Sequence, residues 1–193
     1  MSEETRQRII EAGADLINRQ GFNGTGLKEI LDAAGVPKGS FYHYFKSKEA
    51  FGLAVVDYFA ARFGNMFREV VADTSLSPLS RLNTILAIVE ERFEKQECRQ
   101  GCPIGNLAQE MGGLSDQFQV HLRQVIDRMA AAFGDLIRQG QEQGEVRPDL
   151  DPVETAYFIV SSWHGALIRM KVTRSLEPLK LCHRFFDDLL RIR

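Results

Sequence analysis

Apolar residues recur at helical spacing along the chain, and no stretch alternates with the period of a strand. The first helix is predicted from about Glu4 to Gln20, with Gly21 as its stop. A short amphipathic helix follows, in which Leu27, Ile30 and Leu31 share one face. This pattern of apolar residues therefore predicts an all-α fold for the whole chain.

The remaining helices have recognisable starts. A capping Ser or Asp, or a proline in the first turn, stands at several of these starts. We expect helices to begin at Ser47, at Ser77-Pro78, near Ser115, at Asp151-Pro152 and after Pro178. The helix from Ser115 is expected to run to Gln143. All five carry apolar stripes, so together they predict a helical body behind the N-terminal helices.

Gly35 lies between two short helices. It can take the positive φ that ends a helix, and Val36 then supplies a hydrophobic plug. Pro37 suits the first turn of the second helix, and the Thr25 hydroxyl stands where the first needs an N-cap. Two helices joined by such a turn are typical of a helix-turn-helix, whose second helix enters the DNA major groove.

The second helix has one apolar face and one polar face. Phe41 and Phe45, four residues apart, are expected to hold it on the other helices. Gly39 would let the backbone approach DNA closely, and Lys38 could reach guanine acceptors. The donors suited to phosphates are Tyr42, His43, Lys46 and Lys48.

The block Pro37-Lys38-Gly39-Ser40-Phe41-Tyr42-His43-Tyr44-Phe45-Lys46-Ser47-Lys48-Glu49 closely resembles the DNA-binding signature of the TetR family of bacterial repressors. The resemblance implies a three-helix DNA-binding head over residues 1–50 and a helical regulatory and dimerisation body over 51–193. It implies base contacts by Lys38, Gly39 and Tyr42. It implies backbone contacts by Thr25, Lys28, Ser40, His43, Lys46 and Lys48. Gly26 departs from the family, which commonly carries a hydroxyl there.

The net charge of the chain does not by itself indicate a DNA-binding protein. The 193-residue chain has a net charge of −2, and residues 1–50 carry as many acids as bases. A DNA-binding face must therefore come from local segregation of Lys38 to Lys48, and its binding should depend on salt. The polar start and the absence of a long apolar run predict a cytoplasmic protein with no membrane segment.

The last two predicted helices carry apolar residues on more than one face, among them Phe185 and Leu189. One stripe can cover the chain's own core, and the other needs a partner. We expect a homodimer through these helices, which suits a helix-turn-helix that reads a palindrome. The alternative is that both faces are buried within one subunit.

Cys98, Cys102 and Cys182 do not make a secretory disulfide framework. Cys102 precedes Pro103 and so lies next to a predicted helix N-terminus, where a thiolate is stabilised. Cys98, four residues away, could act as a resolving thiol. Cys182 lies among Leu181, Phe185 and Phe186 and reads as a core residue, which is also the alternative interpretation of Cys102.

The head sequence, and the tail from Trp163 through Lys171-Val172-Thr173-Arg174 to Leu179, are similar to a subgroup of TetR-type repressors that sense reactive electrophiles. Repressors of N-ethylmaleimide reductase genes belong to it. The resemblance implies that Cys102 is the sensing cysteine and that Lys171 lies near it. The predicted function is a repressor that leaves a palindromic operator when electrophiles or oxidants modify Cys102.

Three alternatives remain. Such a repressor could instead be induced by reversible binding of a small apolar ligand. A thiol enzyme pairing Cys102 with His164 lacks a readable acid or oxyanion site, so we expect no enzyme. A helical protein-binding module is the third possibility, and loss of duplex binding in Lys38→Ala would argue against it. The histidines show no metal-ligand spacing with the cysteines, and we expect neither a metal nor a cofactor.

Overall fold

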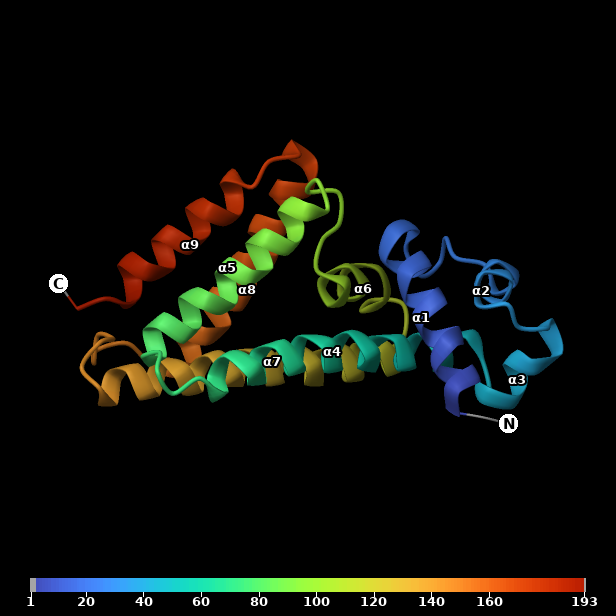
Figure 1. Cartoon of the computed structure of the whole chain (residues 1–193), viewed down its shortest axis with the longest axis horizontal. Helices are drawn as coiled ribbons and strands as arrows, with labels where there is room; N and C mark the ends of the chain where they lie inside the picture. The colour runs from blue at the N-terminus through green and yellow to red at the C-terminus, as the bar shows by residue number, and fades with distance from the viewer. Residues whose placement is uncertain (1–2, 193) are drawn as a thin grey trace. The chain divides into compact units, whose positions relative to one another are not determined.

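A computed structural model describes residues 3–192, which form nine α-helices and no strand (Figure 1). The all-α prediction is confirmed. The helices are α1 (Glu3–Gln20), α2 (Leu27–Ala34), α3 (Phe41–Tyr44), α4 (Lys48–Ala72), α5 (Pro78–Lys95), α6 (Pro103–Met111), α7 (Asp116–Glu142), α8 (Pro152–Thr173) and α9 (Glu177–Leu190). A 3-10 turn, η1 (Lys38–Ser40), precedes α3.

The described chain divides into two compact units. The first contains the residues up to Phe63 together with Pro103–Gln124, and the second contains Gly64–Cys102 together with the residues from Val125 onward. This division places α6 and the first turns of α7 in the unit that carries the helix-turn-helix. The expected domain boundary at residue 50 stays a prediction.

Aromatic side chains form the centre of the first unit. The Phe41 ring centroid lies 5.3 Å from that of Phe45 and 5.7 Å from that of Phe51, and all three side chains are buried. Ile9 of α1 and Ile30 of α2 are buried in the same unit. The predicted role of Phe41 and Phe45 in holding the second helix is confirmed.

The turn after α2 forms as predicted. Gly35 has a φ of +64°, its N–H donates to the carbonyl of Asp32 at 3.2 Å, and the N–H of Val36 donates to that of Leu31 at 3.0 Å. Val36 is buried and serves as the plug. Pro37, however, does not occupy a first helical turn, because it is extended (ψ 145°) and directly precedes η1.

The predicted N-cap of α2 is wrong. The cap residue is Gly26, which has no side-chain hydrogen bond to offer. The Thr25 hydroxyl instead donates to the carbonyl oxygen of Gly21 at 2.6 Å, and Thr25 is 0% exposed. An interaction within the preceding turn has therefore replaced the cap.

In the second unit, α5, α8 and α9 pack together (Figure 1). The starts of α5 and α8 match the predictions, whereas α9 begins at Glu177, before Pro178 and not after it. The Asp151 carboxylate accepts from the N–H groups of Val153 and Glu154 at 2.8 Å each. The Ser77 hydroxyl accepts from the N–H of Ser80 at 3.3 Å. The apolar core where these helices meet consists of Phe93, Cys98, Ala166, Leu167, Met170 and Leu179. None of the helices in residues 3–192 is long and apolar enough to cross a membrane.

Candidate functional site

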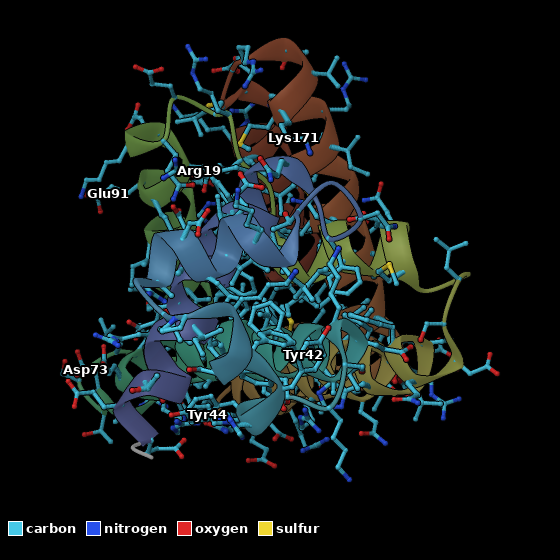
Figure 2. All side chains as sticks on the ribbon, turned by 90° about the vertical axis from the view of Figure 1, so that its right-hand side faces the viewer. Arg19, Tyr42, Tyr44, Asp73, Glu91 and Lys171 are labelled. Carbon is cyan, nitrogen blue, oxygen red and sulfur yellow. The ribbon has the colours of Figure 1, made fainter. Side chains whose placement is uncertain are left out.

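The short segment formed by η1 and α3 presents the residues expected to read bases. Lys38 and Gly39 are exposed. Tyr42, which is labelled in Figure 2, has a side chain that is 62% exposed. The Tyr42 ring is held edge-on against the buried Phe41 ring, with centroids 5.4 Å apart. A Cβ atom at Gly39 would meet nothing within 4 Å, so the fold itself does not require a glycine there. An unobstructed backbone at this position suits close approach to another molecule.

The residues expected to contact the DNA backbone fall into two groups. Lys28, His43 and Lys46 are exposed, and Ser40 is half-buried, so these four can face a ligand. Thr25 and Lys48 have partners inside the unit. The Lys48 ammonium donates to the carbonyl oxygen of Phe22 at 2.7 Å and lies 4.6 Å from the centre of the Phe22 ring.

Burial lowers the pKa of Lys48, while the nearby Glu110 carboxylate opposes that change by favouring the charged form. The sequence pattern did not reveal the contact between Lys48 and Phe22, because a lysine that follows the second helix is equally typical of a phosphate contact. Its partner lies 26 residues away, and no local spacing signals it.

The three cysteines gather in the second unit. Cys98 is part of the apolar core of α5, α8 and α9, and half-buried Cys102 and Cys182 pack against the same core, as does Trp163. The α6 helix begins at Pro103, directly after Cys102, as predicted. Cys102 is thus the last residue of one compact unit, and the next residue begins the other.

The surroundings of Cys98, the expected resolving thiol, and of Cys182, the expected core residue, raise the pKa of both thiols. Burial, followed by the nearby Glu94 carboxylate, raises the pKa of the Cys98 thiol, and Arg174 only partly opposes this. Burial raises the pKa of Cys182 to about 11. Because the thiolate is the nucleophile, both residues favour the unreactive form near neutral pH.

Lys171 lies on an exposed position of α8 (Figure 2). It belongs to the last turn of that helix, whereas the α8 residues Ala166, Leu167 and Met170 contribute to the core against which Cys102 packs. The structure therefore brings the expected sensor cysteine to α8, and Lys171 is on the solvent side of the same helix.

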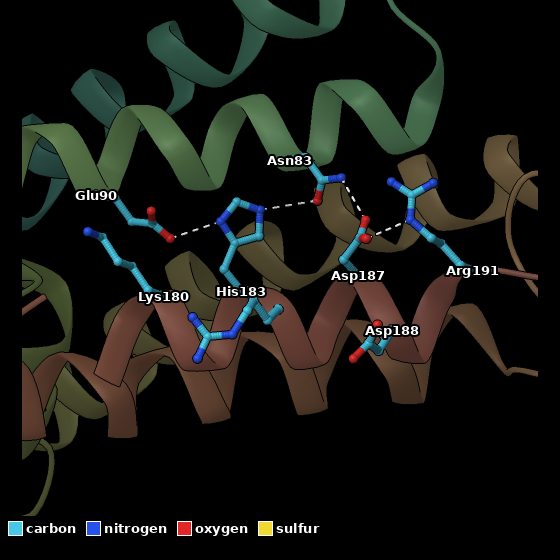
Figure 3. Close-up of a pocket in the computed structure, with 8 residues that line it drawn as sticks. Asn83, Glu90, Lys180, His183, Asp187, Asp188 and Arg191 are labelled. Atoms are coloured by element: carbon cyan, nitrogen blue, oxygen red, sulfur yellow. Dashed lines mark hydrogen bonds and ion pairs between the residues drawn. The ribbon is translucent and has the colours of Figure 1, made fainter. Parts of the chain in front are cut away.

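A polar network that the sequence did not predict joins α5 to α9 (Figure 3). His183 contacts the Glu90 carboxylate at 2.9 Å through Nδ1 and the Asn83 amide oxygen at 3.2 Å through Nε2. The Asn83 amide nitrogen donates to Asp187 at 2.9 Å, and Arg191 donates to the other carboxylate oxygen of Asp187 at 2.5 Å. These residues border an open pocket of about 550 Å³. They fasten the last helix to α5.

Metal binding and thiol catalysis gain no support from the geometry. Within residues 3–192, no group of three or more His, Cys, Asp or Glu side chains is placed to hold a metal ion. Burial lowers the pKa of His164, which favours the neutral form of its ring.

An apolar surface runs over α8 and α9. It carries Phe158, Leu181 and Phe185, of which Phe185 is 64% exposed. These side chains border a broad apolar depression of about 960 Å³, which Cys182 also reaches. Large apolar side chains exposed together on neighbouring helices indicate a surface that a partner covers.

Comparison with known proteins shows which family the chain belongs to. Residues 9–55 match the family of bacterial regulatory proteins named tetR, and residues 78–186 match the tetracyclin repressor-like C-terminal domain. The transcriptional regulator AcuR of Cereibacter sphaeroides is 38% identical, over 93% of this chain and 82% of its own. The transcriptional repressor DhaR of Mycobacterium sp. is 38% identical, over 90% and 86%. The transcriptional repressor NemR of Escherichia coli is 32% identical, over 92% and 89%.

Solved structures agree. A regulatory protein TetR from Rhodobacter sphaeroides superposes with a TM-score of 0.91 at 37% identity, covering 96% of this chain and 98% of its own. The reduced form of Escherichia coli NemR superposes with a TM-score of 0.88 at 27% identity, covering 99% of each chain. With its helix-turn-helix and helical body both matched, this chain belongs to the TetR family of bacterial transcriptional regulators.

Proposed function

We propose that the protein is a dimeric transcriptional repressor that leaves its operator when an electrophile or oxidant modifies Cys102. The observation that carries the proposal is the position of Cys102. Its side chain packs against the core of α5, α8 and α9, and the next residue begins α6, which belongs to the compact unit of the helix-turn-helix. Two relatives, DhaR and NemR, are named as repressors.

In this function, η1 and α3 read the operator. Lys38 and Tyr42 supply donors to base edges, and the bare backbone at Gly39 allows them to approach. Lys28, His43 and Lys46 supply phosphate contacts, which hold the register without reading sequence. Thr25 and Lys48 act from inside the unit, because their polar atoms already have partners there.

The dimer forms through the apolar surface of α8 and α9. Phe158, Leu181 and Phe185 would become buried against the same surface of a second copy, as a twofold interface requires. The two helix-turn-helix units of a dimer then read half-sites roughly one helical turn of DNA, about 34 Å, or a multiple of it apart.

Modification of Cys102 acts through packing. An adduct, or an oxidised sulfur, adds volume or polarity where a half-buried side chain meets a filled core. Overpacking of this kind typically destabilises a core by about 1–3 kcal/mol. A shift of that size in favour of a second arrangement changes the equilibrium between the two arrangements by about 5- to 150-fold. Lys171 is exposed in the last turn of α8, and it would speed the reaction only where its ammonium reaches the Cys102 sulfur, because a nearby cation favours the thiolate.

The test is operator binding before and after treatment with N-ethylmaleimide. The probe is a palindromic duplex selected from random DNA by the untreated wild-type protein. Wild type and Cys182→Ser should release the duplex, whereas Cys102→Ser should bind it and ignore the reagent. Peptide mapping should find the adduct on Cys102 first. Release of the Cys102→Ser protein by the reagent would remove this mechanism. If no thiol reagent acts on the wild type, reversible induction by an apolar ligand becomes the better explanation.

A further inference from the structure

The last turn of α6 is fastened to the turn between α1 and α2. The two carboxylate oxygens of Glu110 each accept one backbone N–H, from Phe22 at 2.8 Å and from Asn23 at 2.7 Å. The side-chain amide nitrogen of Asn23 also donates to the sulfur of Met111 at 3.5 Å. Hydrogen bonds to an ionised carboxylate are roughly twice as strong as neutral ones, so a paired set makes a firm connection.

The same turn is held from its other side by α4. Lys48 donates to the carbonyl oxygen of Phe22, the residue whose N–H is bound by Glu110. The Phe22 ring lies edge-on to Phe118 of α7, with centroids 5.1 Å apart. Phe22 therefore has its N–H, its carbonyl and its ring bound by three different helices, and the turn cannot move independently of them.

Gly21 is shaped for this contact. Its φ is +84°, which side chains rarely tolerate, and a Cβ atom there would lie 2.9 Å from Oε2 of Glu110. Any larger residue would push the carboxylate away from the two N–H groups. The absence of a side chain at position 21 thus serves the Glu110 contact as well as the end of α1.

The turn between α1 and α2 also positions α2, the first helix of the helix-turn-helix. The Thr25 hydroxyl donates to the carbonyl of Gly21, and the N–H of Thr25 donates to that of Phe22 at 3.3 Å. The next residue, Gly26, begins α2 without a side-chain cap. The start of α2 therefore takes its position from residues 21–25.

We propose that Glu110 is the positioning residue that couples α6 to the DNA-reading helices. The inference rests on the proposed function in one respect, because it assumes that the helix-turn-helix binds DNA. The α6 helix has nine residues, short enough to move as a rigid rod, and begins directly after Cys102. A displacement at its first residue reaches the Phe22–Asn23 turn through the Glu110 carboxylate. By reciprocity, DNA bound by the helix-turn-helix must also stabilise α6.

The experiment measures this reciprocal effect without any thiol reagent. Amide hydrogen exchange is followed in peptides covering Pro103–Met111, with and without the selected duplex. In wild type, DNA should slow exchange in α6 by at least about fivefold, the lower end of typical coupling. In Glu110→Gln the side chain keeps one acceptor but turns an amide NH₂ towards the second N–H, so the slowing should disappear.

The matched control is Glu142→Gln, at the exposed last residue of α7, which should behave as wild type. Both variants should retain the thermal midpoint of unfolding to within a few degrees, which separates lost coupling from lost folding. If Glu110→Gln shows the same DNA-dependent slowing as wild type, or if wild type shows none, the coupling role is refuted. Because no cysteine is modified, failure of thiol sensing would leave this result unaffected, and the two proposals are tested separately.

Discussion

The Lys48 ammonium donates to the carbonyl oxygen of Phe22 across 2.7 Å and covers the face of the Phe22 ring at 4.6 Å. One cation thus joins the Thr25 N–H at the Phe22 carbonyl oxygen and also covers a face of the Phe22 ring. Such a contact stabilises the head of the molecule, and it makes this lysine unlike the exposed lysines of the DNA-reading segment.

We expect Lys48→Ala to reduce the free energy of unfolding by about 1–3 kcal/mol, because a charged hydrogen bond and a cation–π contact are both lost. Urea denaturation at neutral pH measures this. Lys46→Ala, which removes an exposed lysine two residues earlier, should change stability by less than about 0.5 kcal/mol. Equal stability of the two variants would show that the Phe22 contact contributes nothing.

Lys38 and Lys46 should separate base reading from phosphate binding. We expect Lys38→Ala to lose about 1–3 kcal/mol of discrimination between the selected duplex and one altered at a single base pair. Lys46→Ala should weaken binding to both duplexes alike and reduce the salt dependence by about one unit of slope. Fluorescence titrations at several salt concentrations provide both quantities. Parallel losses on the two duplexes for Lys38→Ala would argue against base contact.

A substitution at Phe185 tests the proposed dimer interface of α8 and α9. It is exposed by 64% on α9 beside Leu181, and a carboxylate there would be buried without a partner in a twofold contact. Phe185→Asp should therefore give monomers in light scattering and weaker binding to palindromic DNA. Leu114→Asp, at an exposed apolar residue between α6 and α7, should remain dimeric. A monomeric wild type would contradict the assignment outright.

The surroundings of Asp187 predict that the stability of the folded protein depends on pH. Hydrogen bonds from Arg191 and Asn83 hold the pKa of its carboxyl below the usual value, despite partial burial that acts the other way. A carboxyl whose folded-state pKa is depressed stabilises the protein above its unfolded-state pKa. That contribution is lost as the pH falls through the folded-state value. Asp187→Asn should thus be less stable than wild type at neutral pH, with the difference shrinking below about pH 4.

Urea denaturation of both proteins from pH 7 to pH 3 measures the difference. Asp188→Asn, at the exposed neighbouring residue, is the control and should show little difference from wild type at any pH in this range. A stability difference for Asp187→Asn that stays constant with pH would mean that packing, and not the charge, explains its effect.

Local signals in the sequence determined most of the secondary structure. Asp151, Ser77 and Gly35 act within a few residues of their own positions, so caps and turns of this kind can be read before the fold is known. The spacing of Phe41 and Phe45 likewise predicted which face of the second helix is buried. The residue types of the DNA-reading segment were sufficient to suggest its function.

Only the tertiary structure decided which polar side chains face solvent and which bind another helix. Lys48, Thr25, Glu110 and His183 all carry groups that would suit an exposed surface. Glu110 finds its partners 87 and 88 residues away, and His183 finds Glu90 and Asn83 at distances of 93 and 100 residues. Helical periodicity reports on neighbours three and four residues apart, whereas these pairs form because packed helices bring remote backbone and carboxylate groups together.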